Sequence, residues 1–96
     1  MRYFHRTSLP PDDALAVADE FFGSRTQTLA TVGRRRTFRH AGGTLGIDVR
    51  VEGGHYTLVT VTTDQLGESE VDKLAKRYLA VVHAAVHRQH EVRGAY

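Results

Sequence analysis

The chain has 96 residues, of which 41% are hydrophobic and 25% are charged, which is ordinary composition for one small globular domain. It contains no cysteine, which excludes disulfides, thiolate catalysis, iron–sulfur clusters and cysteine-ligated zinc. The 13 Lys and Arg residues against 11 Asp and Glu leave a formal net charge of +2, which permits nucleic-acid binding without indicating it.

The first third of the chain predicts a strand, a helix and a second strand. Residues 2–7 alternate in polarity and predict a short strand. Pro11 suits the first turn of a helix, two aspartates follow it, and apolar residues then recur at helical spacing, which predicts a helix over residues 11–22. Residues 27–32 alternate again and predict a second strand that ends at Gly33.

Residues 34–64 predict a three-stranded antiparallel meander, because two Gly-Gly pairs, at 42–43 and 53–54, each stand between stretches of alternating polarity. Placing each pair in a two-residue turn collects seven large hydrophobic residues on one face of the sheet. A one-residue slip at either turn would exchange the two faces of a strand. The predicted apolar face carries Phe38, Leu45, Ile47, Val49, Val51, Tyr56 and Leu58.

The same pairing makes the other face of the meander mostly charged or hydroxylic, with two valines that interrupt its polarity. Small antiparallel sheets with an uncovered face often pair with another copy, and an apolar interruption of a polar surface indicates a contact. We therefore predict an interaction face on this side. Its members are Arg35, Arg39, Asp48, Arg50, Val59 and Val61.

The last part of the chain predicts one long helix. Residues 69–72, Ser-Glu-Val-Asp, match a capping box in its acidic form, and an apolar stripe continues from there to about residue 90. We expect residues 1–96 to form a single α+β domain of two layers, in which an antiparallel sheet of four to five strands carries both helices on one face. The element order, β-α-β-β-β-β-α, is similar to that of TATA-binding-protein-like folds and of a short helix-grip fold, although the chain has no sequence motif of either group.

Histidines are the main candidates for chemistry. His83 and His87 stand one turn apart on the predicted last helix, with His90 on the same strip, and such a pair can bind a transition metal. The alternative is a solvated polar face, because no HExxH motif is present and no third ligand is assigned. The register places His40 on the covered face at one end of the sheet, where it either serves as a general base in a cleft or hydrogen-bonds at the rim of the core.

The leading functional prediction is a non-catalytic binding or self-association module that has no cofactor and forms a homo-oligomer, in the simplest case a homodimer. An alternative is a domain that binds a small apolar ligand between the sheet and the last helix. The pocket of that alternative would be lined by His40, Phe38, Tyr56 and Tyr78.

A third prediction is weak nucleic-acid binding through Arg35, Arg39 and Arg50. It ranks below the others because the predicted polar face lacks exposed aromatic residues for base stacking and contains acidic residues that dilute its charge. The N-terminal segment has no apolar run of signal-peptide length, and no stretch has the length of a membrane span, so we expect a cytoplasmic protein.

Overall fold

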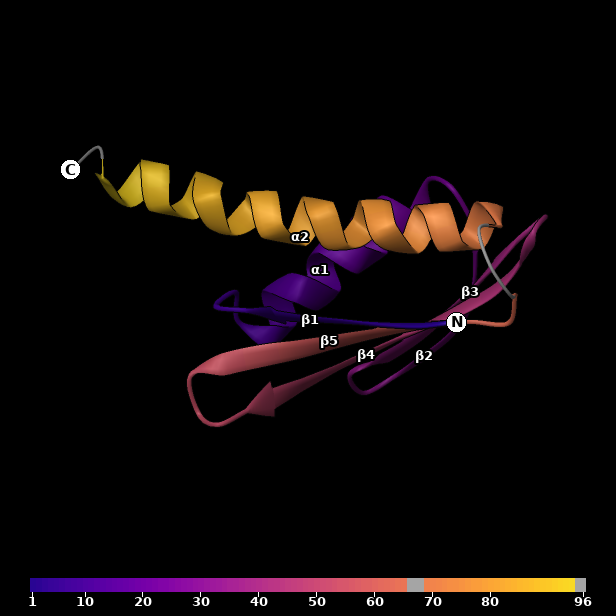
Figure 1. Cartoon of the computed structure of the whole chain (residues 1–96), viewed down its shortest axis with the longest axis horizontal. Coiled ribbons are helices and arrows are strands. Elements are labelled where there is room, and N and C mark those ends of the chain that lie inside the picture. The colour runs from indigo at the N-terminus through magenta and orange to yellow at the C-terminus, as the bar shows by residue number, and fades with distance from the viewer. Residues whose placement is uncertain (66–68, 95–96) are drawn as a thin grey trace.

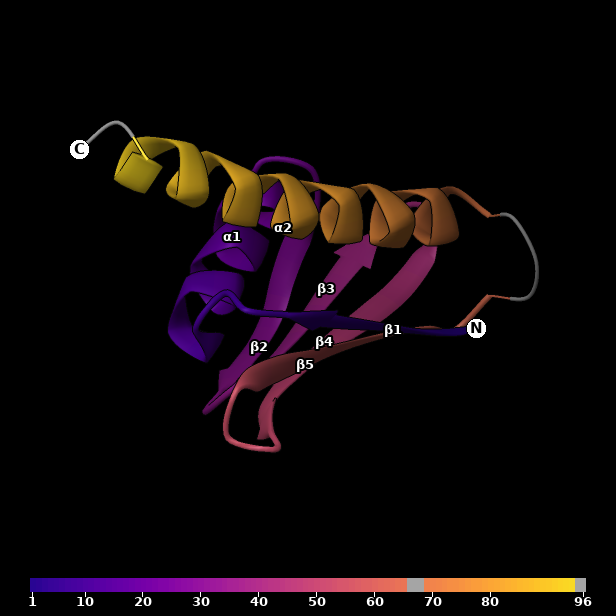
Figure 2. The same ribbon diagram turned by 60° about the vertical axis from the view of Figure 1, so that its left-hand side comes forward.

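A computed structural model describes the backbone of residues 1–65 and 69–94, and the side chains of these residues up to Val86. Its elements are β1 (Arg2–Thr7), α1 (Pro11–Gly23), β2 (Gln27–Val32), β3 (Arg35–His40), β4 (Gly43–Glu52), β5 (Tyr56–Thr63) and α2 (Glu70–Gly94). The strands form one antiparallel sheet in the order β1-β5-β4-β3-β2, and both helices lie over the same face of it (Figures 1 and 2). The predicted α+β class and element order are confirmed. Among the described residues, no helix is both long and apolar enough to cross a membrane.

Helix α1 begins and ends through local hydrogen bonds. The carbonyl of Pro10 accepts the N–H groups of the third and fourth residues after it, each at 3.0 Å, which starts the first turn. At the other end, the Thr26 hydroxyl donates to the Phe22 carbonyl at 2.7 Å, and Nη1 of Arg25 donates to the Phe21 carbonyl at 2.8 Å. These side chains satisfy carbonyls that have no partner within the helix.

The core is centred on Phe22, whose side chain is fully buried between the helices and the sheet. Its ring stacks on Phe38 of β3 at 4.8 Å between centroids and lies 5.2 Å from the ring of Tyr78 on α2. The Tyr78 hydroxyl donates to the Ala14 carbonyl at 2.9 Å and so ties α2 to α1. One buried cluster therefore joins all three parts of the fold.

The first turn of helix α2 contains a hydrogen-bonded aspartate. The backbone N–H of Asp72 donates to Oγ of Ser69 at 3.2 Å, which confirms the predicted cap. The Asp72 carboxylate is fully buried, and it accepts hydrogen bonds from Tyr3 at 2.8 Å, Thr63 at 2.9 Å and Ser69 at 2.5 Å. Burial by itself would raise the pKa of Asp72, but the hydrogen bonds from these three hydroxyls outweigh it and lower the pKa to about 2. This network joins β1, β5 and α2.

The first hairpin of the meander differs from the prediction by two residues. His40 pairs with Gly43, so the turn is made by Ala41 and Gly42, and Phe38 pairs with Leu45. A shift of two residues leaves every side chain on its predicted face. The division of β3 and β4 into a covered and an open face is therefore correct.

The second hairpin differs by one residue, which reverses the faces of β5. Glu52 pairs with Tyr56 across a three-residue loop, in which Gly53 and Gly54 adopt φ values of 65° and 78°. Loops of three residues with left-handed positions are a common hairpin connection. Val59 and Val61 are thereby fully buried under the helices, so their placement on the interaction face was wrong. Each buried valine contributes about 1.5–3 kcal/mol, which favours this register.

Two glycines in β4 provide a test of the strand geometry. Gly43 has φ of 144°, and a Cβ there would lie 2.5 Å from Oδ1 of Asp64, whereas a Cβ on Gly46 would meet only the Arg36 carbonyl at 3.8 Å. We expect Gly43→Ala to lower the free energy of unfolding by about 1–3 kcal/mol, because alanine is strained at this φ. The matched Gly46→Ala should change it by less than about 1 kcal/mol. Urea denaturation measures the free energy of unfolding of both variants. Equal losses of this free energy would contradict the backbone conformation described at Gly43.

Candidate binding face on the open side of the sheet

The side of the sheet that carries no helix is the largest candidate site. Residues that pair directly across neighbouring strands lie on the same face, so the register orders this open face into rows. The central row, from β3 to β1, holds Arg35, Asp48, Thr60 and Phe4. The row on the side of the β4–β5 hairpin holds Arg50, Leu58 and Arg6, and the row beyond it holds Glu52 and Tyr56. On the other side, one row holds Thr37, Gly46, Thr62 and Arg2, and the last holds Arg39 and Thr44.

The open face is positively charged even though it contains ion pairs. Asp48 accepts from Arg50 at 3.0 Å and lies 3.6 Å from Arg35, and Glu52 pairs with Arg6 at 2.6 Å. The rows hold five arginines against these two carboxylates, a net charge of +3, whereas the whole chain has only +2. The positive charge of the molecule is therefore concentrated here. The predicted positions of Arg35, Arg39, Asp48 and Arg50 on this face are confirmed.

Two aromatic side chains are exposed on the same face. Phe4 is 61% exposed and Tyr56 is 55% exposed. Phe4 pairs with Thr60, which stands four residues after Tyr56 in β5, so the two rings lie roughly 13 Å apart along the strand direction. Sequence reasoning missed both, because the predicted register placed Tyr56 on the covered face and left residues 2–7 unpaired with the meander. Residues 57–63 alternate with a period of two and place two valines on one face of the strand. This pattern was the signal that could have corrected the predicted register.

A shallow hollow lies beside Phe4 on this face. Its volume is about 460 Å³, and small or hydroxylic side chains form part of its surface. The residues that line it are Arg2, Phe4, Arg35, Asp48, Arg50, Leu58, Thr60 and Thr62. A second hollow of about 480 Å³ lies at the β1 edge of the sheet, where Phe4, His5, Arg6 and Leu58 line it. Phe4 thus lines both hollows, and each of them is bordered by arginine.

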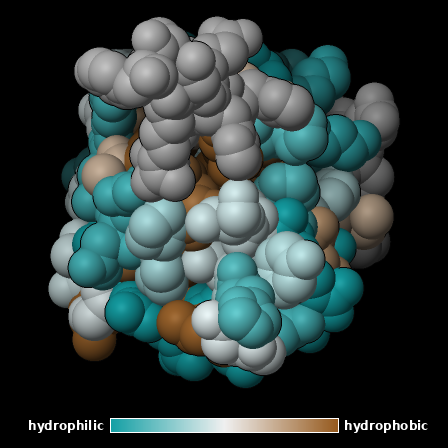
Figure 3. Space-filling model, turned by 90° about the vertical axis from the view of Figure 1, so that its left-hand side faces the viewer, coloured by the Kyte–Doolittle hydropathy of each residue, from teal (hydrophilic) through white to brown (hydrophobic). Residues whose placement is uncertain are grey.

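Exposed hydrophobic groups are scattered rather than gathered into one patch. The larger ones among the described residues are Met1, Phe4, Leu29, Val32, Val51 and Tyr56, which come from four strands and the N-terminal residue. Viewed from the end toward which the β4–β5 hairpin projects, the surface is mainly hydrophilic with small separate hydrophobic areas (Figure 3). Large continuous apolar patches mark obligate interfaces. The open face is instead a mixture of arginine, hydroxyl and aromatic groups.

The predicted apolar-ligand pocket is not formed by its four residues. Phe38 and Tyr78 are fully buried in the aromatic core, while Tyr56 points to the opposite side of the sheet. His40 lies half-buried at the end of the sheet, where its Nδ1 accepts the N–H of Gly42 at 3.1 Å. The one-residue shift of β5 accounts for the error with Tyr56. His40 therefore has a hydrogen-bonding role at the turn, which is the second of its two predicted roles.

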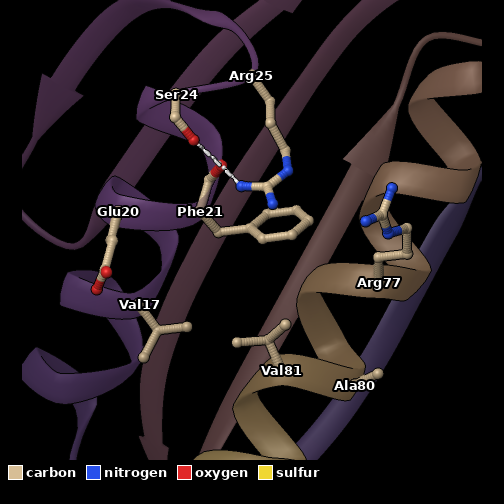
Figure 4. A pocket seen from close by; sticks show the side chains of 8 residues that line it. All are labelled: Val17, Glu20, Phe21, Ser24, Arg25, Arg77, Ala80 and Val81. Atoms are coloured by element: carbon tan, nitrogen blue, oxygen red, sulfur yellow. Dashed lines mark hydrogen bonds between the residues drawn. The ribbon is translucent and has the colours of Figure 1, made fainter.

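A groove of about 550 Å³ runs between the two helices on the side away from the sheet (Figure 4). Val17, Phe21 and Val81 provide its apolar surface, with Arg25 and Arg77 at one end. The Arg25 guanidinium lies 4.2 Å from the centroid of the Phe21 ring while it donates to the last turn of α1. Capping the last turn of α1 thus accounts for the position of Arg25.

Of the three histidines predicted on one strip of the last helix, His83 is the one whose side chain the structure describes. His83 is exposed on α2, and the side chains of His87 and His90 lie outside the described residues. No group of three or more His, Asp or Glu side chains that could hold a metal occurs among the described residues. His5 of β1, which the sequence assigned no role, has its ring centroid 6.0 Å from that of His83. Burial lowers the pKa of His5, and the charge of His83 lowers it further.

No protein-family model matches this chain, and no curated protein matches its sequence.

Proposed function

We propose that this domain is a non-catalytic binding module whose open sheet face binds single-stranded nucleic acid. The observation that carries the proposal is the presence of two exposed aromatic rings, on Phe4 and Tyr56, on a face of net positive charge. Sequence-tolerant binding of single strands combines these two features, because bases stack on aromatic rings while arginines neutralise the phosphates.

The rows of the open face supply both kinds of contact. A base stacked on Phe4 would have Arg2 and Arg35 at the rim of the adjoining hollow, within the same set of lining residues. A base stacked on Tyr56 would lie next to the row that carries Arg50 and Arg6. Stacking contributes about 1–3 kcal/mol per base, and each phosphate contact adds a salt-dependent contribution.

Self-association through this face, the leading prediction from sequence, loses its main support. It rested on Val59 and Val61, which are fully buried. Two copies meeting face to face would also bring two surfaces of net positive charge together, and such like-charge contact is unfavourable. The positive charge of this face attracts a polyanion, whereas it repels the same face of a second copy.

The proposal is tested by the fluorescence anisotropy of labelled oligo(dT) and oligo(rU), about 12 nucleotides long. We expect saturable binding that weakens steeply with salt. Phe4→Ala and Tyr56→Ala should each weaken it about 5- to 150-fold, which corresponds to the loss of one stacked base. Arg39→Ala should weaken binding to all sequences and reduce the salt slope by about 1.

Arg77→Ala provides the matched control, because it removes the same charge from an exposed arginine on the helical layer. It should leave affinity within about twofold of the parent, since the open face is on the other side of the sheet. Equal losses of affinity in Arg39→Ala and Arg77→Ala would show that the binding is nonspecific electrostatic attraction. Concentration-dependent sedimentation that Phe4→Ala abolishes would instead identify the face as an interface between copies.

A further inference from the structure

The contact between His5 and His83 brings together two elements far apart in the chain. His5 is on the covered side of edge strand β1, where it pairs with Val59 and is partly buried, and His83 is on the exposed side of α2. Their ring planes are inclined by 75°, and their centroids are 6.0 Å apart. The helical layer lies on the opposite side of the sheet from the open face (Figure 1), and His5 also lines the hollow at the β1 edge.

We propose that His5 and His83 together bind one divalent transition-metal ion of the Zn²⁺ and Ni²⁺ class. Imidazole nitrogen binds these ions at about 2.0–2.1 Å, so each ring centroid would lie about 3.2 Å from the metal. Ligand angles between tetrahedral and linear then require centroid separations of about 5–6.4 Å. The observed 6.0 Å falls in this range, so the separation of the two rings fits one shared ion.

Two imidazoles leave the coordination sphere of such an ion incomplete. The exposure of His83 leaves room for water to complete the coordination sphere. A two-histidine site of this kind binds more weakly than a closed structural zinc site. Its effect would be to hold edge strand β1 against α2.

Isothermal titration of the tag-free full chain with ZnCl₂ at neutral pH tests the proposal. We expect one ion per chain, with affinity that falls at least about tenfold in His5→Gln and in His83→Gln, because each loses one of two ligands. The matched control is His55→Gln, which changes an exposed histidine in the β4–β5 hairpin and should leave the affinity unchanged. The parent should also show a higher unfolding temperature with Zn²⁺, and both ligand variants should lose that rise.

Two further arms keep the test decisive. His87→Gln examines the pair predicted from sequence: if it abolishes binding while His5→Gln does not, the site lies along the helix and the proposal is overturned. Should His5→Gln fail to fold, Ni²⁺ added to the parent must broaden NMR signals of both β1 and α2, and broadening of α2 alone would refute the contact. Absence of any binding to the parent at millimolar Zn²⁺ would also refute it.

Discussion

Phe22→Ala is expected to lower the free energy of unfolding by about 3–5 kcal/mol, which is the usual loss when a fully buried phenylalanine is truncated. The Phe22 side chain is completely buried and lies 4.9 Å from the ring of Phe21, measured between centroids. It also contacts one aromatic ring from the sheet and one from α2. No single neighbour can fill the resulting cavity, because those rings come from three different elements.

The matched control is Phe4→Ala, which makes the same chemical change at a residue that is 61% exposed. It should alter the free energy of unfolding by less than about 1 kcal/mol, because little apolar surface is buried there. Urea denaturation followed by circular dichroism measures both variants. A loss at Phe4 as large as that at Phe22 would contradict the described exposure of Phe4.

Asp72→Ala is the second large expected effect, at about 2–4 kcal/mol of unfolding free energy near neutral pH. The change leaves the hydroxyl groups of Tyr3, Thr63 and Ser69 without their shared acceptor inside the fold. It also removes negative charge from the first turn of α2, where the helix dipole favours it. The matched control is Asp12→Ala in the first turn of α1, an exposed aspartate whose loss should cost well under half as much.

The contribution of Asp72 should depend on pH with a defined sign. Its pKa in the folded state is lowered to about 2, while an aspartate in an unfolded chain titrates near about 3.9. A carboxylate with a lowered pKa stabilises the fold fully above its unfolded pKa and loses that contribution as pH falls towards the folded value. The difference between the parent and Asp72→Asn should thus be constant from about pH 5 to 7 and shrink towards pH 2. A difference that grew on acidification would contradict the described network.

The elements of this fold could be predicted because their signals are local. A proline followed by two aspartates begins α1, Ser69 and Asp72 begin α2, and the predicted strand at residues 27–32 coincides with β2. Each of these signals depends on backbone groups within a few residues. These local signals do not depend on how distant parts of the chain are paired.

The sheet register could not be predicted as well, since it depends on the length of each turn. A Gly-Gly pair permits a turn but does not fix which residues occupy it. In the first hairpin the Gly-Gly pair begins at the second residue of the two-residue turn. In the second hairpin the Gly-Gly pair and His55 together form a three-residue loop. One added residue moved Val59 and Val61 into the core and Tyr56 onto the open face.

The candidate sites depended on contacts between distant parts of the chain. Phe4 of the open face lies on β1, and the histidine pair joins β1 to α2. Spacing within a single element therefore found His83 but could not find His5 as its neighbour. The arginines of β3 and β4 were placed correctly because the shift in the first hairpin preserved their faces.

The pairing of β1 with β5 also has a consequence for the order of folding. Strands β2 to β5 are joined by short turns, whereas β1 pairs Arg2 with Thr62 and can dock only after β5 is in place. Closing so long a loop carries a larger entropy cost than closing a hairpin, so we expect β1 to join the sheet late and to open first. Phe4 and His5 both lie on this strand. Hydrogen exchange at β1 would thus report how often the molecule opens both the open face and the histidine pair.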